Sequence, residues 1–297
     1  RSVEEAAKVL SQCGYGDFSR INLKAVEEKI EDMRREIYDD LLSDIPDMGI
    51  RDVFRIKFDY HNIKVVLKSD FSEEKSQRLL VDAGRLPIEE LQEALFQMDL
   101  QNIPPIMAES ITAARESLAV NGDPQLADFI LDKASYEEML AAAEATDIDF
   151  LVGLVRLMID AINLKSIVRA LRLDKDTDFM RKLLLPGGDF SIDSIILLAG
   201  TGSNFESLYS SGELAKAASL AGSLTKGGSL TELEKLCDNA IMEYLGTARY
   251  TAFGPETVIG YLYAKEAEFS AIRIIMTGLI AGIDIDIIRE RLREAYV

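Results

Sequence analysis

The sequence has few of the residues from which most catalytic sites are built. Among 297 residues there is one histidine, His61, two cysteines, Cys13 and Cys237, and no tryptophan. A single imidazole excludes most histidine-based metal sites and argues against Ser-His-Asp catalysis. Because no Cys or His lies near His61, we expect no ligand role for it. Two isolated thiols without metal-ligand spacing are typical of a reducing, cytosolic compartment.

Basic residues are also scarce. Lys and Arg number 33 against 51 acids, which gives a net charge of -18. Such a surface repels phosphate backbones, so we expect no nucleic-acid partner, and adsorption to anionic lipid is disfavoured as well. Basic protein partners would be attracted, although acidic charge also serves solubility alone.

Long hydrophobic runs and strand patterns are missing too. The most apolar late stretch, residues 269–288, is interrupted by Arg273, Asp284 and Asp286, so it predicts no membrane span. No signal peptide is visible, and the chain starts at Arg1 on a helical segment, so we expect a natural N-terminal portion to precede it. Alternating apolar and polar runs are short, which predicts an all-α fold.

One nine-residue pattern is present three times, about 100 residues apart. It combines an acid, an aliphatic residue and a base at fixed spacing in residues 59–67, 160–168 and 268–276, and Ala271 replaces the Asn of the first two copies. The candidate structural positions are Asp59, Asn62, Lys64, Asp160, Asn163, Lys165, Glu268 and Arg273. On a helix the acid and the Asn are neighbours beside an apolar stripe. We expect a structural pair that bonds to backbone or to a neighbouring helix, because chemistry rarely needs the same pair in three places.

A helix-start signal follows each copy, at Pro87-Ile88-Glu89, Ser191-Ile192-Asp193 and Asp284-Ile285-Asp286. Each unit is therefore predicted to be a motif helix, a turn and a second helix. The sequence predicts three similar helical repeats, at residues 1–105, 106–200 and 201–297.

Helical spacing and helix breakers predict the individual elements. The expected helices are 2–12, 22–42, 50–67, 87–96, 106–118, 124–146, 149–173, 230–245, one that begins near Pro255, and 284 almost to 297. Ser2 and Glu5 form a capping box at the first of these. The Gly- and Ser-rich segment 200–228 is predicted to be the least regular part, a loop region with weak helix at 212–221.

The sequence contains none of the common ligand-binding motifs in complete form. The segment Asp174–Asp178 begins like a calcium loop, but Phe179 and Leu185 stand where Gly and Glu are required. There is no P-loop, and Gly200-Thr201-Gly202 lacks the third Gly of a dinucleotide loop. We predict no catalytic residues, no cofactor and no metal.

The third repeat carries a family resemblance. The runs Phe253-Gly254-Pro255-Glu256, 261–266, 272–275 and 288–293 closely resemble the C-terminal signature of the C subunit of V-type and A-type ATP synthases, which is called the d subunit in eukaryotic vacuolar ATPases. Residues 59–68 and 163–171 look like the first and second repeat signatures of that family, so the resemblance covers essentially the whole chain. The chain departs from the family at Ser270 and Ala271, where the family tends to be more polar.

The resemblance implies a fold and a function. The fold would be a funnel of three similar helical bundles around a pseudo-threefold axis. Its wide end would seat the rotor-shaft subunits of the soluble head, and its base would sit on the membrane proteolipid ring. The implied role is a non-catalytic central-stalk subunit that transmits torque for proton or sodium transport, peripheral on the cytoplasmic face, without direct lipid insertion.

Two alternatives come from other classes. One is a free-standing all-α adaptor of the HEAT or armadillo kind, although repeats there recur at about 40 residues rather than 100. The other is an all-α enzyme that uses acid clusters and magnesium, for which only the failed Asp174 segment offers a candidate.

Overall fold

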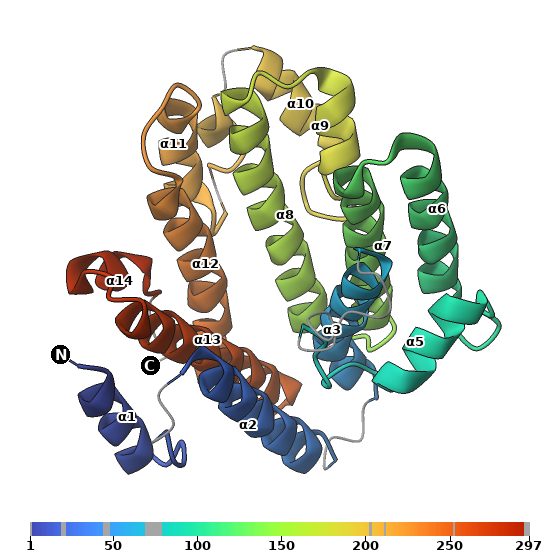
Figure 1. The fold of residues 1–297 in the computed structure, drawn as a ribbon. Coiled ribbons are helices and arrows are strands. Elements are labelled where there is room, and N and C mark those ends of the chain that lie inside the picture. The colour runs from blue at the N-terminus through green and yellow to red at the C-terminus, as the bar shows by residue number, and fades with distance from the viewer. Residues whose placement is uncertain are drawn as a thin grey trace. The chain divides into compact units, whose positions relative to one another are not determined.

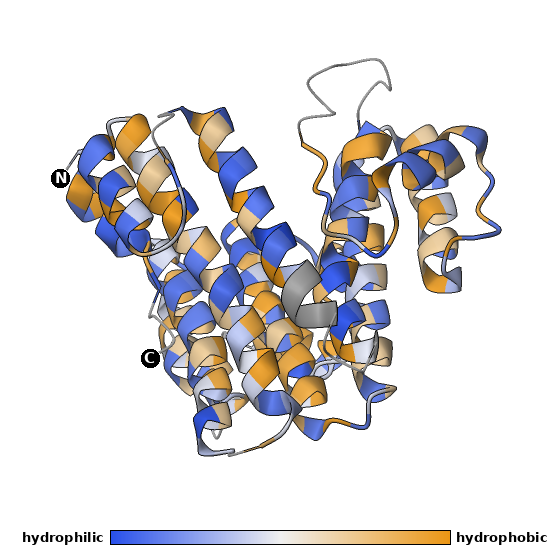
Figure 2. Cartoon of the chain, turned by 90° about the horizontal axis from the view of Figure 1, so that it is seen from below, coloured by the Kyte–Doolittle hydropathy of each residue, from blue (hydrophilic) through white to orange (hydrophobic). Residues whose placement is uncertain are grey.

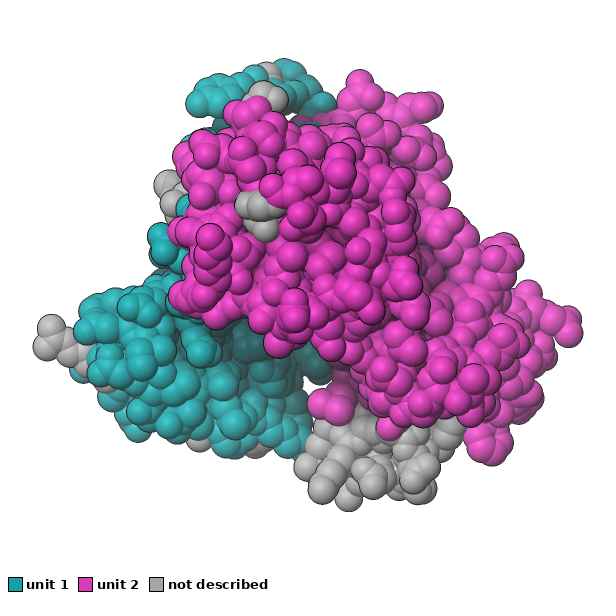
Figure 3. Space-filling view, turned by 90° about the horizontal axis from the view of Figure 1, so that it is seen from above, with its two compact units in different colours: residues 1–45, 229–297 teal, residues 46–228 magenta. Residues whose placement is uncertain are grey.

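The fold is helical throughout the part that the structure describes. The computed structural model describes residues 2–18, 22–43, 48–68, 79–201, 204–210, 212–251 and 253–293. Every regular element in these ranges is a helix, so the predicted all-α class is confirmed (Figure 1). The chain divides into two compact units, residues 1–45 with 229–297 and residues 46–228 (Figure 3). The three-repeat division at 105 and 200 stays a prediction.

The unit of residues 46–228 is built around α7 and α8. Its elements are α3 (Met48–Lys68), α5 (Ile88–Gln97), α6 (Pro105–Asn121), α7 (Pro124–Glu144), α8 (Asp149–Arg172), α9 (Thr177–Leu183), α10 (Ile192–Gly200), the 3-10 helix η1 (Phe205–Ser207) and α11 (Ala215–Leu224). Helix α7 packs against α3, α6, α8 and α9, and α8 also contacts α9, α10 and α11. The two helices therefore carry most of the core of this unit.

Local signals explain where the α6–α7 hairpin turns. Pro105 occupies the first turn of α6, and Gly122 ends it in the left-handed region at φ 61°. Asp123 then caps α7 by accepting a hydrogen bond from the Gln125 N–H at 2.9 Å, and Pro124 takes the first helical position. These caps place the helix ends within three residues of the predicted ones.

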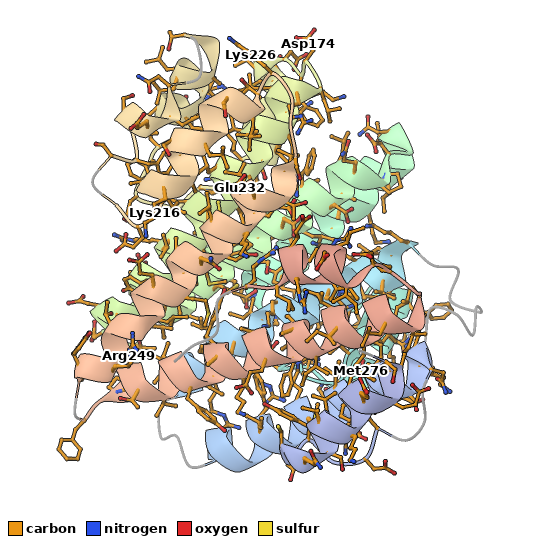
Figure 4. All side chains as sticks on the ribbon, turned by 90° about the vertical axis from the view of Figure 1, so that its left-hand side faces the viewer. Asp174, Lys216, Lys226, Glu232, Arg249 and Met276 are labelled. Atoms are coloured by element: carbon orange, nitrogen blue, oxygen red, sulfur yellow. The ribbon has the colours of Figure 1, made fainter. Side chains whose placement is uncertain are left out.

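The second unit is built around α13 and joins both ends of the chain. Its elements are α1 (Val3–Gln12), α2 (Leu23–Ser43), α12 (Leu230–Gly246), the 3-10 helix η2 (Thr247–Tyr250), α13 (Pro255–Ile280) and α14 (Ile285–Arg291). Helix α13 packs against α1, α2, α12 and α14. The shared core includes Val26 and Ile30 from α2 with Phe269, Ile272 and Met276 from α13. Met276 is labelled in Figure 4. The first residues of the chain thus cover the third motif helix.

The predicted cap of the first helix is present. The Ser2 hydroxyl accepts from the Glu5 N–H at 3.2 Å. The next helix begins in the same way, because the Asn22 side chain accepts from the Ala25 N–H at 2.9 Å.

Two segments of the unit of residues 46–228 differ from the prediction. The weak helix expected at 212–221 is present as α11, Ala215–Leu224, and its Ala217, Ala218 and Ala221 are buried. The segment 200–228 also contains η1, so it is more regular than the loop region that was predicted around that helix. Small side chains let α11 lie close to α8, which explains why the composition looked like a loop. Helix α9 was not predicted; Asp176, tested as a calcium ligand, caps it by accepting from the Phe179 N–H at 2.8 Å.

The last helix is shorter than predicted. Helix α14 ends at Arg291, and Leu292 is extended at φ -73° and ψ 144°. The change of direction lets Arg293 Nε bond Asp238 Oδ2 of α12 at 2.7 Å. A tertiary contact therefore overrides the helical preference of the sequence here.

Both apolar and polar residues are distributed along the helices (Figure 2). Within the described ranges, none of the helices combines the length and the apolar content that crossing a membrane requires.

Candidate functional site

The first motif helix holds the loop that follows it by two polar side chains. The Nδ2 of Asn62 donates to the Val81 carbonyl at 2.9 Å, and its Oδ1 accepts from the Val81 N–H at 2.9 Å. Asp59, one turn earlier on α3, accepts from the N–H groups of Arg85 and Leu86 at 2.8 and 3.2 Å. Both side chains are fully buried. We call this arrangement the first backbone clamp.

The second motif helix repeats the arrangement. The Asn163 side chain exchanges two hydrogen bonds with the backbone of Leu185, both at 2.8 Å. The Asp160 carboxylate accepts from the Asp189 N–H at 2.9 Å. As in the first clamp, the backbone partner of the acid lies four residues after the partner of the Asn. We call these residues the second backbone clamp.

In each clamp the backbone of a glycine lies against the carboxylate of the acid. A Cβ atom on Gly84 would come within 2.2 Å of Asp59 Oδ1, and a Cβ on Gly188 would come within 2.1 Å of Asp160 Oδ1. Real Cβ atoms do not approach an oxygen so closely, so only glycine lets the loop backbone reach the carboxylate. This contact explains why glycine occupies positions 84 and 188, shortly before α5 and α10.

The third motif helix has no such clamp. Glu268, in the place of Asp59, is exposed and accepts from the Tyr15 hydroxyl at 2.5 Å and from Lys265 at 2.8 Å. Only residues 281–284 separate α13 from α14, so there is no long loop for Glu268 and Ala271 to hold. The replacement of Asn by Ala271 is thus explained by the shorter connection.

The basic residue of the motif forms an ion pair in the first and third copies. Lys64 pairs with Asp132 of α7. Arg273 forms a bidentate pair with Glu27 of α2, its Nε and Nη2 each lying 2.8 Å from a carboxylate oxygen. Lys165 is half-buried on α8. Lys64 and Arg273 therefore each attach a motif helix to a neighbouring helix of the same unit.

A buried ion pair completes the first clamp, and the sequence did not point to it. Arg85 Nε lies 2.8 Å from Asp59 Oδ2, and its Nη2 lies 2.8 Å from Glu138 Oε1 of α7. The Tyr60 hydroxyl donates to the other oxygen of Glu138 at 2.9 Å. Glu138 is only 8% exposed and lies one turn after Ala134 and Ser135 on the buried face of α7. An acid among the buried positions of α7 is a sequence signal that could have indicated a buried ion pair.

Burial sets the protonation of these groups. It raises the pKa of Asp59, while the guanidinium of Arg85 and the N–H groups of Leu86 and Arg85 act in the opposite direction. Burial and the Glu138 carboxylate raise the pKa of Tyr60. For Asp160 burial raises the pKa to about 7; the Asp189 N–H lowers it, the Asp189 charge raises it, and the Phe190 N–H lowers it.

These polar groups hold backbone and leave little for chemistry. The lone imidazole, His61, lies at the exposed side of α3 with Nε2 2.8 Å from the Leu79 carbonyl. In the described part of the chain, His, Cys, Asp and Glu side chains form no group of three that could hold a metal ion. The arrangement can fix the course of a loop, and we find no set of described residues suited to acid–base or nucleophilic work.

Helices α1 and α13 also border a groove that is mainly apolar. Its lining includes Ala6, Val9 and Leu10 from α1 with Ile272 and Ile275 from α13. Glu5, Lys8 and Gln12 of α1 also line the groove.

Comparison with known proteins identifies the family. The sequence matches the ATP synthase (C/AC39) subunit family over residues 1–291. It is 22% identical over 279 residues to the C subunit of the V-type sodium ATPase of Enterococcus hirae, covering 92% of this chain and 83% of that protein. It is 26% identical over 254 residues to the C subunit of the A-type ATP synthase of Haloferax volcanii, covering 80% and 71%. For the C subunit of the A-type ATP synthase of Methanocaldococcus jannaschii, identity is 23% over 320 residues, covering 98% and 79%. The chain therefore belongs to the ATP synthase (C/AC39) subunit family, as a non-catalytic C subunit of the V/A-type ATPases.

Proposed function

We propose that this chain is the central-stalk coupling subunit of a V/A-type ATPase. In this role it seats the rotor shaft of the soluble head on the membrane proteolipid ring and transmits torque between ATP turnover and ion movement. The main support for this proposal is the family match over residues 1–291, which includes all three motif helices. The relatives are named as subunits of a sodium ATPase and of ATP synthases, so the transported ion is either sodium or a proton.

Torque transmission requires a subunit that does not deform under load, and the two backbone clamps would stiffen this one. Each ties a motif helix to its following loop through buried hydrogen bonds, which are worth more inside a protein than at its surface. We assign Asp59, Asn62, Asp160 and Asn163 this structural role. Lys64, Lys165, Glu268 and Arg273 are assigned to the attachment of each motif helix to its neighbours.

The order of helix contacts supports three repeats around one axis. Helix α2, directly before the first motif helix, packs on the third motif helix α13. Helix α7, directly before the second motif helix, packs on the first, α3. Helix α11, from the third predicted repeat, packs on the second motif helix α8. In each case a helix of one predicted repeat lies on the motif helix of another, as a ring of three repeats would require. We propose the pseudo-threefold funnel on this basis.

The proposed place is the cytoplasmic face of the membrane, bound peripherally through the complex. The net charge of -18 opposes direct adsorption to anionic lipid, so attachment would be through protein partners. Basic patches on the shaft or ring subunits would be attracted by this charge, and the attraction would weaken as salt shortens the screening length to about 8–10 Å.

Reconstitution with and without this subunit tests the proposal. Proteoliposomes that contain the complete complex should take up sodium or protons on ATP addition, while complexes that lack this chain should hydrolyse ATP without uptake. Parallel assays of sodium uptake and of internal acidification identify the ion. Full uptake without the chain would contradict the coupling role. Loss of hydrolysis in the isolated head upon its omission would contradict the non-catalytic one.

A further inference from the structure

The two backbone clamps have the same hydrogen-bond pattern, but the loop residue that binds the acid is basic in the first clamp and acidic in the second. The Asp59 carboxylate has the guanidinium of Arg85 at 2.8 Å. In the second clamp the residue in the place of Arg85 is Asp189, an acid. Asp160 Oδ1 is buried without a hydrogen-bond partner, and the residue is 2% exposed. A carboxylate that is buried without a cation is costly to ionise.

The cations around Asp160 are committed to other groups. Arg156, one turn earlier on α8, lies 3.4 Å from Glu144 of α7 and 3.8 Å from Asp189. On α7, Lys133 donates to the Arg181 carbonyl at 2.8 Å. Among the described residues, no cation forms a hydrogen bond or ion pair with Asp160.

The remaining neighbours of α8 do not supply a counter-charge either. Arg181 of α9 pairs with Asp193 of α10 at 2.6 Å. Lys216 is the one charged side chain of α11, and it has its own interaction partner. The charge that acts on Asp160 is the negative one of Asp189, which raises its pKa further.

The loop backbone closes one side of the site. The Gly188 backbone lies directly over Oδ1, so that even a methyl group there would come within 2.1 Å of it. Burial raises the pKa of the carboxyl to about 7, which is within the physiological range.

We propose that Asp160 is a proton-binding site that controls how firmly the loop of residues 185–190 is attached to α8. With a proton bound, the second clamp is neutral and the loop stays closed over α8. When the proton leaves, a buried charge next to Asp189 favours opening of the loop and loosens α10, which follows it. This inference does not depend on the proposed function, because it concerns the chain by itself.

A carboxyl titration of the full chain tests the first step. Carbon-13 NMR of Asp carboxyl groups, with Asp160→Asn to identify the signal, should show Asp160 titrating near pH 7. A titration below pH 5 would overturn the proposal, because the buried group would then already be ionised at neutral pH.

Unfolding experiments test the consequence. The pKa of this carboxyl is raised on folding from about 3.9, so the folded state binds the extra proton between pH 4 and pH 7. Relative to Asp160→Asn, the unfolding constant of the unmodified chain should rise about tenfold per pH unit in that window, and then level off about a thousandfold higher. A ratio that is constant with pH would overturn the proposal.

The same substitution in the first clamp is the matched control. Asp59→Asn removes a charge partner of Arg85, so at pH 7 it should raise the unfolding constant, whereas Asp160→Asn should lower it. Hydrogen exchange at pH 8 should report at least tenfold stronger protection of the 185–190 amides in Asp160→Asn than in the unmodified chain. Equal protection would show that the proton does not control the loop.

Discussion

At the residue scale, the structure explains why an amide and a carboxylate occupy the core of a motif helix. A buried backbone N–H and C=O need partners, and a loop that crosses a helix has no ladder to supply them. The Asn163 side chain offers one donor and one acceptor in a single planar group, so it satisfies both backbone groups of Leu185 at 2.8 Å. No aliphatic residue of the same size can do so.

Replacing this Asn should be costly. Asn163→Leu leaves a buried N–H and a buried C=O unpaired, so we expect the free energy of unfolding to fall by about 1–3 kcal/mol. The exposed Asn121, whose Nδ2 makes a 3.4 Å contact with Ser117, is the control, and Asn121→Leu should change it by less than about 0.5 kcal/mol. Chemical denaturation measures both. An unchanged midpoint for Asn163→Leu would show that the loop can detach at no cost.

The sequence predicted the type of role for these residues better than their partners. The spacing of Asp160 and Asn163 beside an apolar stripe indicated a polar pair in the core, and both are buried. The atoms they bind could not be predicted, because they lie in a loop 29 and 22 residues later, respectively, whose path depends on the whole fold. Arg85 and Glu138 were missed for the same reason: their contact joins two helices through a loop that has no pattern of its own.

At the element scale, the connection between a motif helix and its second helix depends on a glycine. Gly188→Ala would force a methyl group into Asp160 Oδ1, which lies 2.1 Å from the ideal Cβ position. We expect the free energy of unfolding to fall by about 1–3 kcal/mol, as in other overpacked sites. Gly84→Ala in the first clamp should behave similarly, since its contact with Asp59 is 2.2 Å.

A control and a double mutant separate this contact from general effects of glycine. Gly200, at the end of α10, has no atom within 4 Å of its Cβ position, so Gly200→Ala should be neutral or stabilise by about 0.4–1 kcal/mol. In an Asp160→Ala background, Gly188→Ala should lose most of its effect. Equal effects with and without the Asp160 side chain would mean that the methyl group collides with something else.

Element boundaries show where sequence patterns stop being informative. The helix start at Asp123-Pro124 was predictable because the cap and the proline act within three residues. The end of α14 at Arg291 was not, since it depends on the contact of Arg293 with Asp238 across the unit. In 200–228, Gly and Ser suggested a loop, but Ala217, Ala218 and Ala221 serve as close-packing positions of α11.

At the scale of the whole molecule, one unit is continuous in sequence and the other is assembled from the two ends of the chain. Residues 46–228 form one compact unit, and residues 1–45 and 229–297 form the other. Periodicity within the sequence could predict helices, but not that the first helices of the chain would pack on the third motif helix. Arg34 of α2 bonds Glu266 of α13 at 2.9 Å, and Tyr15 bonds Glu268, so the N-terminal segment is specifically matched to the third motif helix.

The last prediction follows from that division. A fragment of residues 46–228 should fold by itself and unfold cooperatively, because its helices pack on one another. The fragment of residues 229–297 should be largely unfolded alone, since Phe269, Ile272 and Met276 would lose the α2 side chains that cover them, at about 1.5–3 kcal/mol for each buried side chain. Mixing it with residues 1–45 should restore helicity, measured by circular dichroism. Fragment 1–45 with Ile30→Asp should not restore it, because that position is fully buried in the shared core. Full helicity of the 229–297 fragment as a monomer would contradict this account of how the two chain ends fold together.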